Sequence, residues 1–148
     1  MSLFDDVGGY DILKKVNKIF YDKIYKHPWI GQFFQSVPQE HIENQQTDLM
    51  AQAMGGPARY FGRFVIDAHT HIYITEELFQ VREKLLQEAF HEAGATALLI
   101  EKWGKIDEAF KKALLKKTPT DCKPRYAREE ILDFPNPEAT INPHKKAA

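Results

Sequence analysis

Two histidines that lie two residues apart, His69 and His71, are the side chains of this sequence best suited to bind a metal ion. On a β-strand both would project from one face and could hold zinc together. A zinc site normally takes at least three protein ligands, however, and only His91 and His144 follow in the chain. On a helix the two rings would point about 200° apart, so that one could face a buried ligand while the other faces outward. That second arrangement suits a haem iron, which takes one neutral imidazole as its axial ligand.

Polar and aromatic side chains that interrupt apolar stripes form the second group of candidates. Gln46 stands on an apolar helical stripe, where an unpartnered buried amide would cost about 1–3 kcal/mol. Gln46 is therefore either a residue at the border between core and surface or a hydrogen-bond donor to a ligand. Tyr21 lies at the end of another apolar stripe. It is either a core residue whose hydroxyl reaches the surface or a hydrogen-bond donor that faces a pocket. Phe33 and Phe34 fit either a core or the wall of a pocket for a flat ligand.

The apolar periodicity that would position these residues predicts four long helices, over residues 11–27, 37–54, 75–94 and 96–114. Asp11 caps the first, and Ser36 with Gln39 forms a capping box for the second. Only residues 63–75 lack a clear helical period. Their β-prone triplets are short and have no partner strands, so the fold class is all-α.

Composition limits the remaining possibilities. The chain has 148 residues, enough for one domain, and a formal charge of −1, which gives no overall basic field for nucleic acid. We find no apolar run long enough to span a membrane and no signal peptide, and we therefore expect a cytoplasmic protein. The single cysteine, Cys122, excludes an internal disulfide and a thiolate zinc cage.

The prolines divide the chain into two parts. Five of the eight follow Thr118, so we expect residues 1–117 to form the folded domain and residues 118–148 to form a Pro-rich, extended or disordered extension. An apolar patch at residues 131–134 could dock on the domain or on a partner.

The motifs taken in order carry a resemblance that covers residues 8–94 and, more weakly, the chain up to residue 115. The motifs are Gly8-Gly9, Phe20-Tyr21, Phe33-Phe34, Gly55-Gly56-Pro57, Tyr60-Phe61-Gly62-Arg63, Ala68-His69, and Ile74-Thr75 with Phe79. This order resembles the truncated haemoglobins, most closely their group I branch. The stretch 65–71 also resembles the metal-binding strand of the amidohydrolases. That family is a barrel of roughly 250 residues, which this chain is too short to build. Measuring the metal content of the purified protein would test the resemblance to the amidohydrolases.

The resemblance to the truncated haemoglobins implies a two-on-two helical sandwich that encloses haem b, with the segment before the axial histidine reduced to a turn. It implies that His69 is the iron ligand and that Tyr21 and Gln46 face the bound gas. The other residues that it places around the haem are Phe34, Ile42, Met50, Tyr60, Arg63 and Phe79. Tyr60 and Arg63 are expected at the carboxylate edge, where donors and positive charge are favourable.

Two departures from the family pattern concern the sixth coordination position. Gln45 and Gln46 stand where some members carry a histidine ligand, and His41 is expected to point away, so we expect an open position. Arg82 lies thirteen residues after His69, where the group II and III branches have a tryptophan.

The function that the resemblance implies is binding of O₂, and of NO and CO, at the iron. A phenol and an amide that both hydrogen-bond to O₂ would slow its release, which favours chemistry over storage. We therefore expect nitric oxide dioxygenation with a separate reductase. An O₂ carrier, or a gas or redox sensor whose extension contacts a partner, is the alternative.

Overall fold

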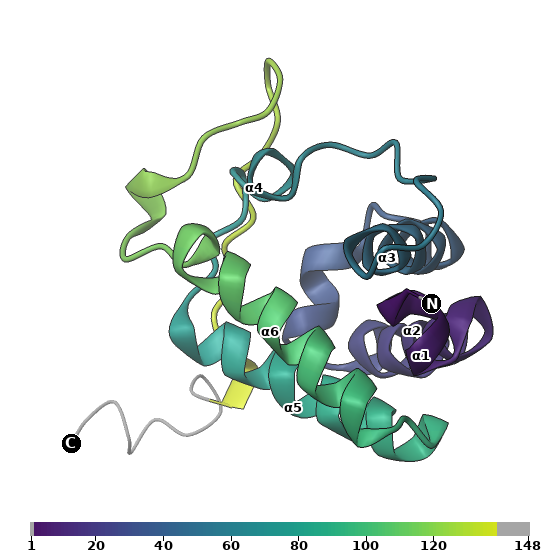
Figure 1. Ribbon diagram of the computed structural model, residues 1–148. Helices are drawn as coiled ribbons and strands as arrows, with labels where there is room; N and C mark the ends of the chain where they lie inside the picture. Colours follow the sequence, from purple (N-terminus) through teal and green to yellow (C-terminus); the bar gives the residue numbers. More distant parts are fainter. Residues whose placement is uncertain (1, 139–148) are drawn as a thin grey trace.

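The computed structural model describes residues 2–138, and every named element of secondary structure in that range is a helix (Figure 1). The elements in chain order are α1 (Leu3–Val7), α2 (Gly9–Lys26), the 3-10 helix η1 (Ile30–Phe34), α3 (Gln39–Ala53), α4 (Val65–Ala68), α5 (Glu76–Ala93), α6 (Ala97–Leu114) and the 3-10 helix η2 (Pro119–Asp121). Among these residues the only β pairing is an isolated parallel bridge between Ile72 and Leu132. The predicted all-α class is confirmed.

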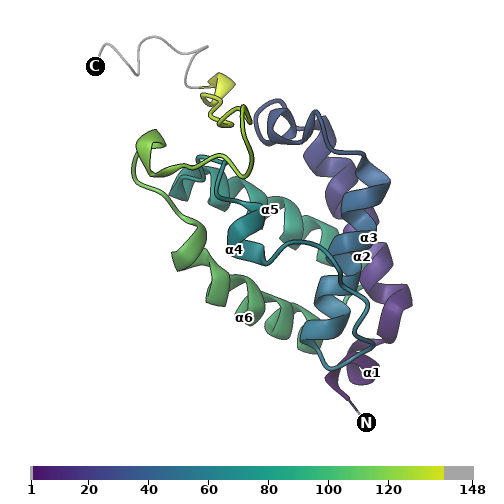
Figure 2. The same cartoon turned by 90° about the horizontal axis from the view of Figure 1, so that it is seen from above.

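The four long helices form two antiparallel pairs. In the first pair, the Asn17 amide of α2 donates to the Thr47 hydroxyl of α3 at 3.0 Å, and the Gln39 amide of α3 donates to Asp22 of α2. Numbers rise along one helix as they fall along the other, so α2 and α3 run in opposite directions. In the contacts of α5 with α6 described below, residue numbers also rise along one helix as they fall along the other, so α5 and α6 are antiparallel as well. Figures 1 and 2 show the two pairs stacked as a two-on-two sandwich.

The core lies where α2 packs against α3 and α5, and Trp103 of α6 adds to it. The largest side chains that are completely enclosed there are Phe20, Phe90 and Trp103. The rings of Phe90 and Trp103 meet edge to face, with their centroids 5.3 Å apart, and thereby join α5 to α6. These three side chains do not line the cavity described below.

The starts of α5 and α6 agree with the helices predicted from residues 75 and 96. The hydroxyls of Thr75 and Thr96 accept hydrogen bonds from the backbone N–H groups of Leu78 and Leu99, at 3.1 and 3.2 Å. Gly94 ends α5 with a left-handed φ of 71°, a conformation that costs glycine little.

The predicted starts of the first two long helices were wrong. Helix α2 begins at Gly9 rather than after Asp11, because Gly8 adopts a φ of 116° and lets the chain turn directly from α1 into α2. No capping box forms at Ser36, since Pro38 is the cap residue of α3 and lacks a side-chain cap bond. The Gln39 amide instead donates to Asp22 and Glu43.

Replacing Thr96 with alanine should lower the free energy of unfolding by about 1 kcal/mol, because the Leu99 N–H would lose its acceptor at the exposed start of α6. Urea titration of the purified protein measures the change. Serine at this position keeps the hydroxyl and serves as the matched control. An alanine variant as stable as the serine variant would show that the cap contributes nothing.

The first part of the predicted extension runs along the folded domain. The Lys123 N–H donates to the Thr70 carbonyl at 2.8 Å, and the Leu132 N–H donates to the His71 carbonyl at 2.9 Å. Phe134 packs edge to face on Phe33, with centroids 5.0 Å apart. The apolar patch at 131–134 therefore contacts this chain's own core. The rest of the predicted extension, residues 139–148, lies outside the described residues.

Among residues 2–138, no helix is both long and apolar enough to cross a lipid bilayer.

Candidate functional site

A cavity of about 850 Å³ opens between the two helix pairs, on the side of α4. Its volume lies in the range of small-molecule and cofactor sites. Helices α2, α3, α5 and α6, together with η1 and the extension, contribute to its walls. Every residue that the sequence analysis selected lines this cavity: Tyr21, Phe34, Ile42, Gln46, Met50, Tyr60, Arg63, His69 and Phe79.

His69 follows α4 directly and has a fixed ring orientation. Its Nδ1 lies 2.6 Å from the backbone oxygen of Val65. A carbonyl can only accept a hydrogen bond, so Nδ1 carries the proton and Nε2 keeps an unprotonated lone pair. Burial lowers the pKa of His69, which keeps the imidazole neutral. These properties are those of a metal-binding imidazole with a defined tautomer.

The backbone around His69 is held by a lysine from the end of α6. The Lys116 ammonium donates to the carbonyl oxygens of His69 and Ile72, at 2.9 and 2.8 Å. Because both carbonyls lie at the turn between α4 and α5, this ammonium holds in place the segment that aims the imidazole. Burial lowers the pKa of Lys116.

Tyr21 and Gln46 reach the cavity from α2 and α3. The Tyr21 side chain is buried and meets Phe34 edge to face at 6.0 Å. Burial raises the pKa of the Tyr21 phenol above its ordinary value of 10, so the hydroxyl remains a donor at neutral pH. Gln46 is half-buried and stands one helical turn after Ile42, with Met50 a further turn on. The cavity thus has hydrogen-bond donors set in an apolar wall.

Tyr60 and Arg63 lie where the loop between α3 and α4 borders the cavity. The Tyr60 hydroxyl donates to the backbone oxygen of Arg63, and the Arg63 side chain is exposed. His41 borders the cavity as well, with an exposed side chain, so the expectation that it points away was wrong.

The expectation that the second histidine faces outward was also wrong. His71 is only 7% exposed and lines the cavity. Helix α4 ends at Ala68, so the 200° separation of a continuous helix does not apply. The extension then covers this segment and places the carboxylate of Glu129 3.9 Å from the His71 Nε2. Burial lowers the pKa of His71 to about 4.

Residues of the extension form a part of the wall that the sequence analysis did not assign to the site. Arg125, Tyr126 and Arg128 line the cavity beside the segment that follows His69. Arg125 holds Glu129 with its side chain, the Nε lying 2.9 Å from Oε2, and with its backbone N–H. The apolar patch at 131–134 was the only sequence signal that this segment returns to the domain.

The Glu129–Arg125 pair should give stability a specific pH dependence. Hydrogen bonds from Arg125 lower the pKa of the Glu129 carboxyl from 4.5 to about 2. Glu129 therefore stabilises the fold fully above pH 4.5 and loses this effect as the pH falls toward 2. Glu129→Gln should cost about 1.5–3 kcal/mol at pH 7 by urea titration, and the cost should shrink below pH 4.5. The neighbouring Glu130→Gln is the control, and a cost for Glu129→Gln that is constant with pH would contradict this assignment.

A buried ion pair joins α5 to α6 at the cavity. The Arg82 guanidinium donates through Nη1 to Asp107 at 2.9 Å and to Glu83 at 2.7 Å. Asp107 is 8% exposed, and both Arg82 and Asp107 line the cavity. Arg82 was recognisable in the sequence as a departure from the family pattern, whereas no sequence pattern marked Asp107 as a residue of the site.

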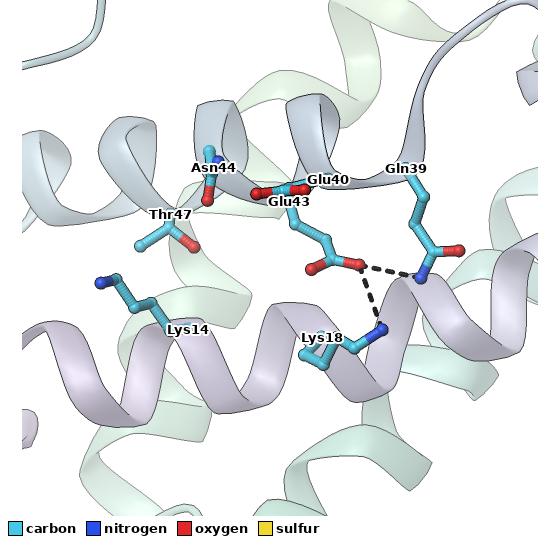
Figure 3. A pocket seen from close by; sticks show the side chains of 7 residues that line it. All are labelled: Lys14, Lys18, Gln39, Glu40, Glu43, Asn44 and Thr47. Carbon is cyan, nitrogen blue, oxygen red and sulfur yellow. Dashed lines mark hydrogen bonds and ion pairs between the residues drawn. The ribbon is translucent and has the colours of Figure 1, made fainter.

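A second hollow, between the outer sides of α2 and α3, shares none of these residues. Figure 3 shows Lys14 and Lys18 of α2 facing polar side chains of α3. The Gln39 amide donates to Glu43 at 2.8 Å, and Lys18 pairs with the same carboxylate at 3.9 Å. Its polar groups bind one another, and it lacks the apolar walls of the main cavity.

The donor set of the main cavity does not suit zinc. Within residues 2–138, no three His, Cys, Asp or Glu side chains gather as a zinc site requires. One oriented imidazole facing apolar and aromatic walls, with arginines at the edge, fits a flat metal-containing cofactor that carries carboxylates. Together with the two-on-two sandwich, this site defines a haem-binding globin of the truncated type.

Comparison with known proteins agrees with that class. The family model of the bacterial-like globins matches residues 2–115, so the chain belongs to this family, and within it to the group I truncated haemoglobins. It is 27% identical over 116 residues to the group 1 truncated haemoglobin of Tetrahymena pyriformis, covering 78% of this chain and 96% of that protein.

Solved structures give the same result. The Fe(III) form of the Tetrahymena pyriformis truncated haemoglobin matches with a TM-score of 0.70 and 26% identity, over 79% of this chain and all of that one. The group II truncated haemoglobin of Bacillus anthracis matches with a TM-score of 0.71 at 17% identity, over 79% of this chain and 92% of that one, a likeness of fold alone. As a truncated haemoglobin, the protein binds haem and a small diatomic gas such as O₂.

Proposed function

We propose that this protein holds haem b through His69 and converts NO and O₂ to nitrate, with a separate reductase as its electron donor. The observation that carries the proposal is the hydrogen bond from the His69 Nδ1 to Val65, which leaves Nε2 available in the cavity that Tyr21 and Gln46 also line. A bound haem would supply a ferrous iron that binds O₂ or CO and gives up one electron as NO and O₂ combine to nitrate. We place this activity in the cytoplasm.

Tyr21 and Gln46 would hold the gas while it reacts. The phenol and the amide would donate hydrogen bonds to a bound gas and would stabilise partial negative charge on it. Each such bond contributes about 1.5–3 kcal/mol, which slows release by roughly ten- to a hundredfold. Slow release is a disadvantage for an O₂ carrier and an advantage for a reaction that must wait for NO.

The apolar walls would serve the haem itself. Phe34, Ile42, Met50 and Phe79 would contact a flat ring system and exclude water from it. Tyr60 and Arg63 would meet its carboxylates at the edge, and Arg125 and Arg128 of the extension would add positive charge beside the proximal segment.

Stopped-flow mixing of NO with the ferrous, oxygenated protein tests the proposal. In the presence of NADH and a flavin-dependent reductase, NO should be consumed over many turnovers, with one nitrate formed for each NO. Consumption that stops after one equivalent, or that yields no nitrate, would contradict the proposed activity.

A sensor is the second candidate, and one contact favours it. The extension pairs with residues 70–73, directly after His69, through the backbone bonds of Lys123 and Leu132. Movement at His69 would therefore reach the extension. A sensor would show little NO turnover and would lose its response to a partner when residues 118–148 are removed.

A further inference from the structure

Arg82 places a positive charge inside the gas-binding cavity. The residue stands in the middle of α5, and its guanidinium lies over two aromatic rings, that of Phe20 in the core and that of Phe79 in the cavity wall. The guanidinium carbon is 5.3 Å from the ring centre of Phe20 and 5.6 Å from that of Phe79. Cation–π contacts of this kind hold a guanidinium without using its N–H donors. Arg82 is therefore fixed and remains able to donate.

The ion pair with α6 uses only a part of the donor capacity of Arg82. Its bonds to Asp107 and Glu83 both start from Nη1. A guanidinium has five N–H donors. Among residues 2–138, the Nε and Nη2 donors have no protein acceptor, although the side chain lines the cavity. Three N–H groups are thus left for a ligand.

Arg82 shares its charge with two carboxyl groups, those of Asp107 and Glu83. Burial raises the pKa of the Glu83 carboxyl to about 7, the Arg82 guanidinium opposes this rise, and the charge of Asp107 adds to it. Asp107 raises the pKa of the guanidinium, which stays charged at every physiological pH. Its field also reaches Tyr21 and His69, the two groups expected on opposite sides of the haem.

We propose that Arg82 determines how tightly the ferric protein binds small inorganic anions, such as azide, fluoride or nitrite, by donating hydrogen bonds to an anion at the open iron position. The inference rests on the proposed function, because it needs a haem whose sixth position faces Tyr21. Hydrogen bonds that a guanidinium donates are charge-assisted, so the unused donors of Arg82 favour a ligand that carries a full negative charge over a neutral gas. Arg82 is then a specificity-determining residue as well as a link between α5 and α6.

Titration of the ferric haem protein with sodium azide and sodium fluoride, followed by absorption, tests the inference. Arg82→Leu should raise both dissociation constants by about ten- to a hundredfold, since one charge-assisted hydrogen bond is lost. The affinity of the ferrous protein for CO, a neutral ligand, should change less than threefold. Arg82→Lys keeps the charge and should bind both anions more tightly than Arg82→Leu does.

Two further variants separate this role from stability and from net charge. Arg82→Leu leaves Asp107 unpaired, so the double variant Arg82→Leu, Asp107→Leu provides the same test without a lone buried charge. The exposed Arg59, whose guanidinium lies 5.2 Å from the ring centre of Tyr10 outside the cavity, gives the control Arg59→Leu, for which anion affinity should not change. Normal CO binding with unchanged anion affinity in the Arg82 variants would overturn the inference alone. Absence of CO binding in the unmutated protein would overturn the proposed function and this inference with it.

Discussion

Replacing His69 with glycine should abolish tight haem binding, and added imidazole should restore it. The hydrogen bond from Nδ1 to Val65 directs Nε2 into the cavity, and no second imidazole in the described chain has that arrangement. Loss of the ligand should speed haem release by at least about a hundredfold, more than the loss of a group that only orients a ligand. Transfer of haem to a competing apoprotein, followed by the Soret band, measures this rate.

Two controls make the result specific to His69. His91 is exposed in the last turn of α5, and His91→Gly should release haem at the unmutated rate. His71→Gln alters the other histidine of the cavity and should retain the iron, although it disturbs the contact with Glu129. If haem were retained by the His69 variant and lost by the His71 variant, the assignment of the ligand would be reversed.

Replacing Tyr21 with phenylalanine should speed O₂ release by about ten- to a hundredfold, because the change removes only the buried hydroxyl and leaves the ring against Phe34. Laser photolysis or stopped-flow displacement by CO measures the rate. Tyr21→Phe combined with Gln46→Leu should release O₂ faster than either single variant, since both donors act on one ligand.

The matched control for Tyr21 is Tyr10→Phe. The Tyr10 hydroxyl is buried without a hydrogen-bond partner in residues 2–138, outside the cavity, so its removal should leave O₂ release unchanged. An O₂ release rate that is the same for Tyr21→Phe and Tyr10→Phe would remove the phenol from the gas-binding site.

The long helices were predictable from sequence because local signals determine them, whereas the site residues were selected from the resemblance of the motif order to a known family. Apolar periodicity and the threonines at positions 75 and 96 gave α5 and α6 their extents and starts. The start of α2 was missed because two consecutive glycines permit a turn that no helical signal describes, and Gly8 rather than Asp11 sets that boundary.

The contacts that sequence reasoning missed join residues far apart in the chain. His71 was expected outside because two residues that lie two apart on a helix point about 200° apart, and its partner Glu129 comes from a segment that was read as separate from the domain. Asp107 looks like an ordinary charged residue of an amphipathic helix until Arg82 lies opposite it. Neither pair has a fixed spacing, so no local pattern could reveal it.

The most direct test of the account is the absorption spectrum of the purified, haem-loaded protein, recorded in the oxidised state and again after reduction under CO. A single imidazole ligand with an open sixth position predicts a Soret band that shifts and sharpens when CO binds to the reduced protein. A protein that takes up no haem, or whose reduced spectrum does not respond to CO, would contradict the central claim that His69 holds a haem with a gas-binding position opposite.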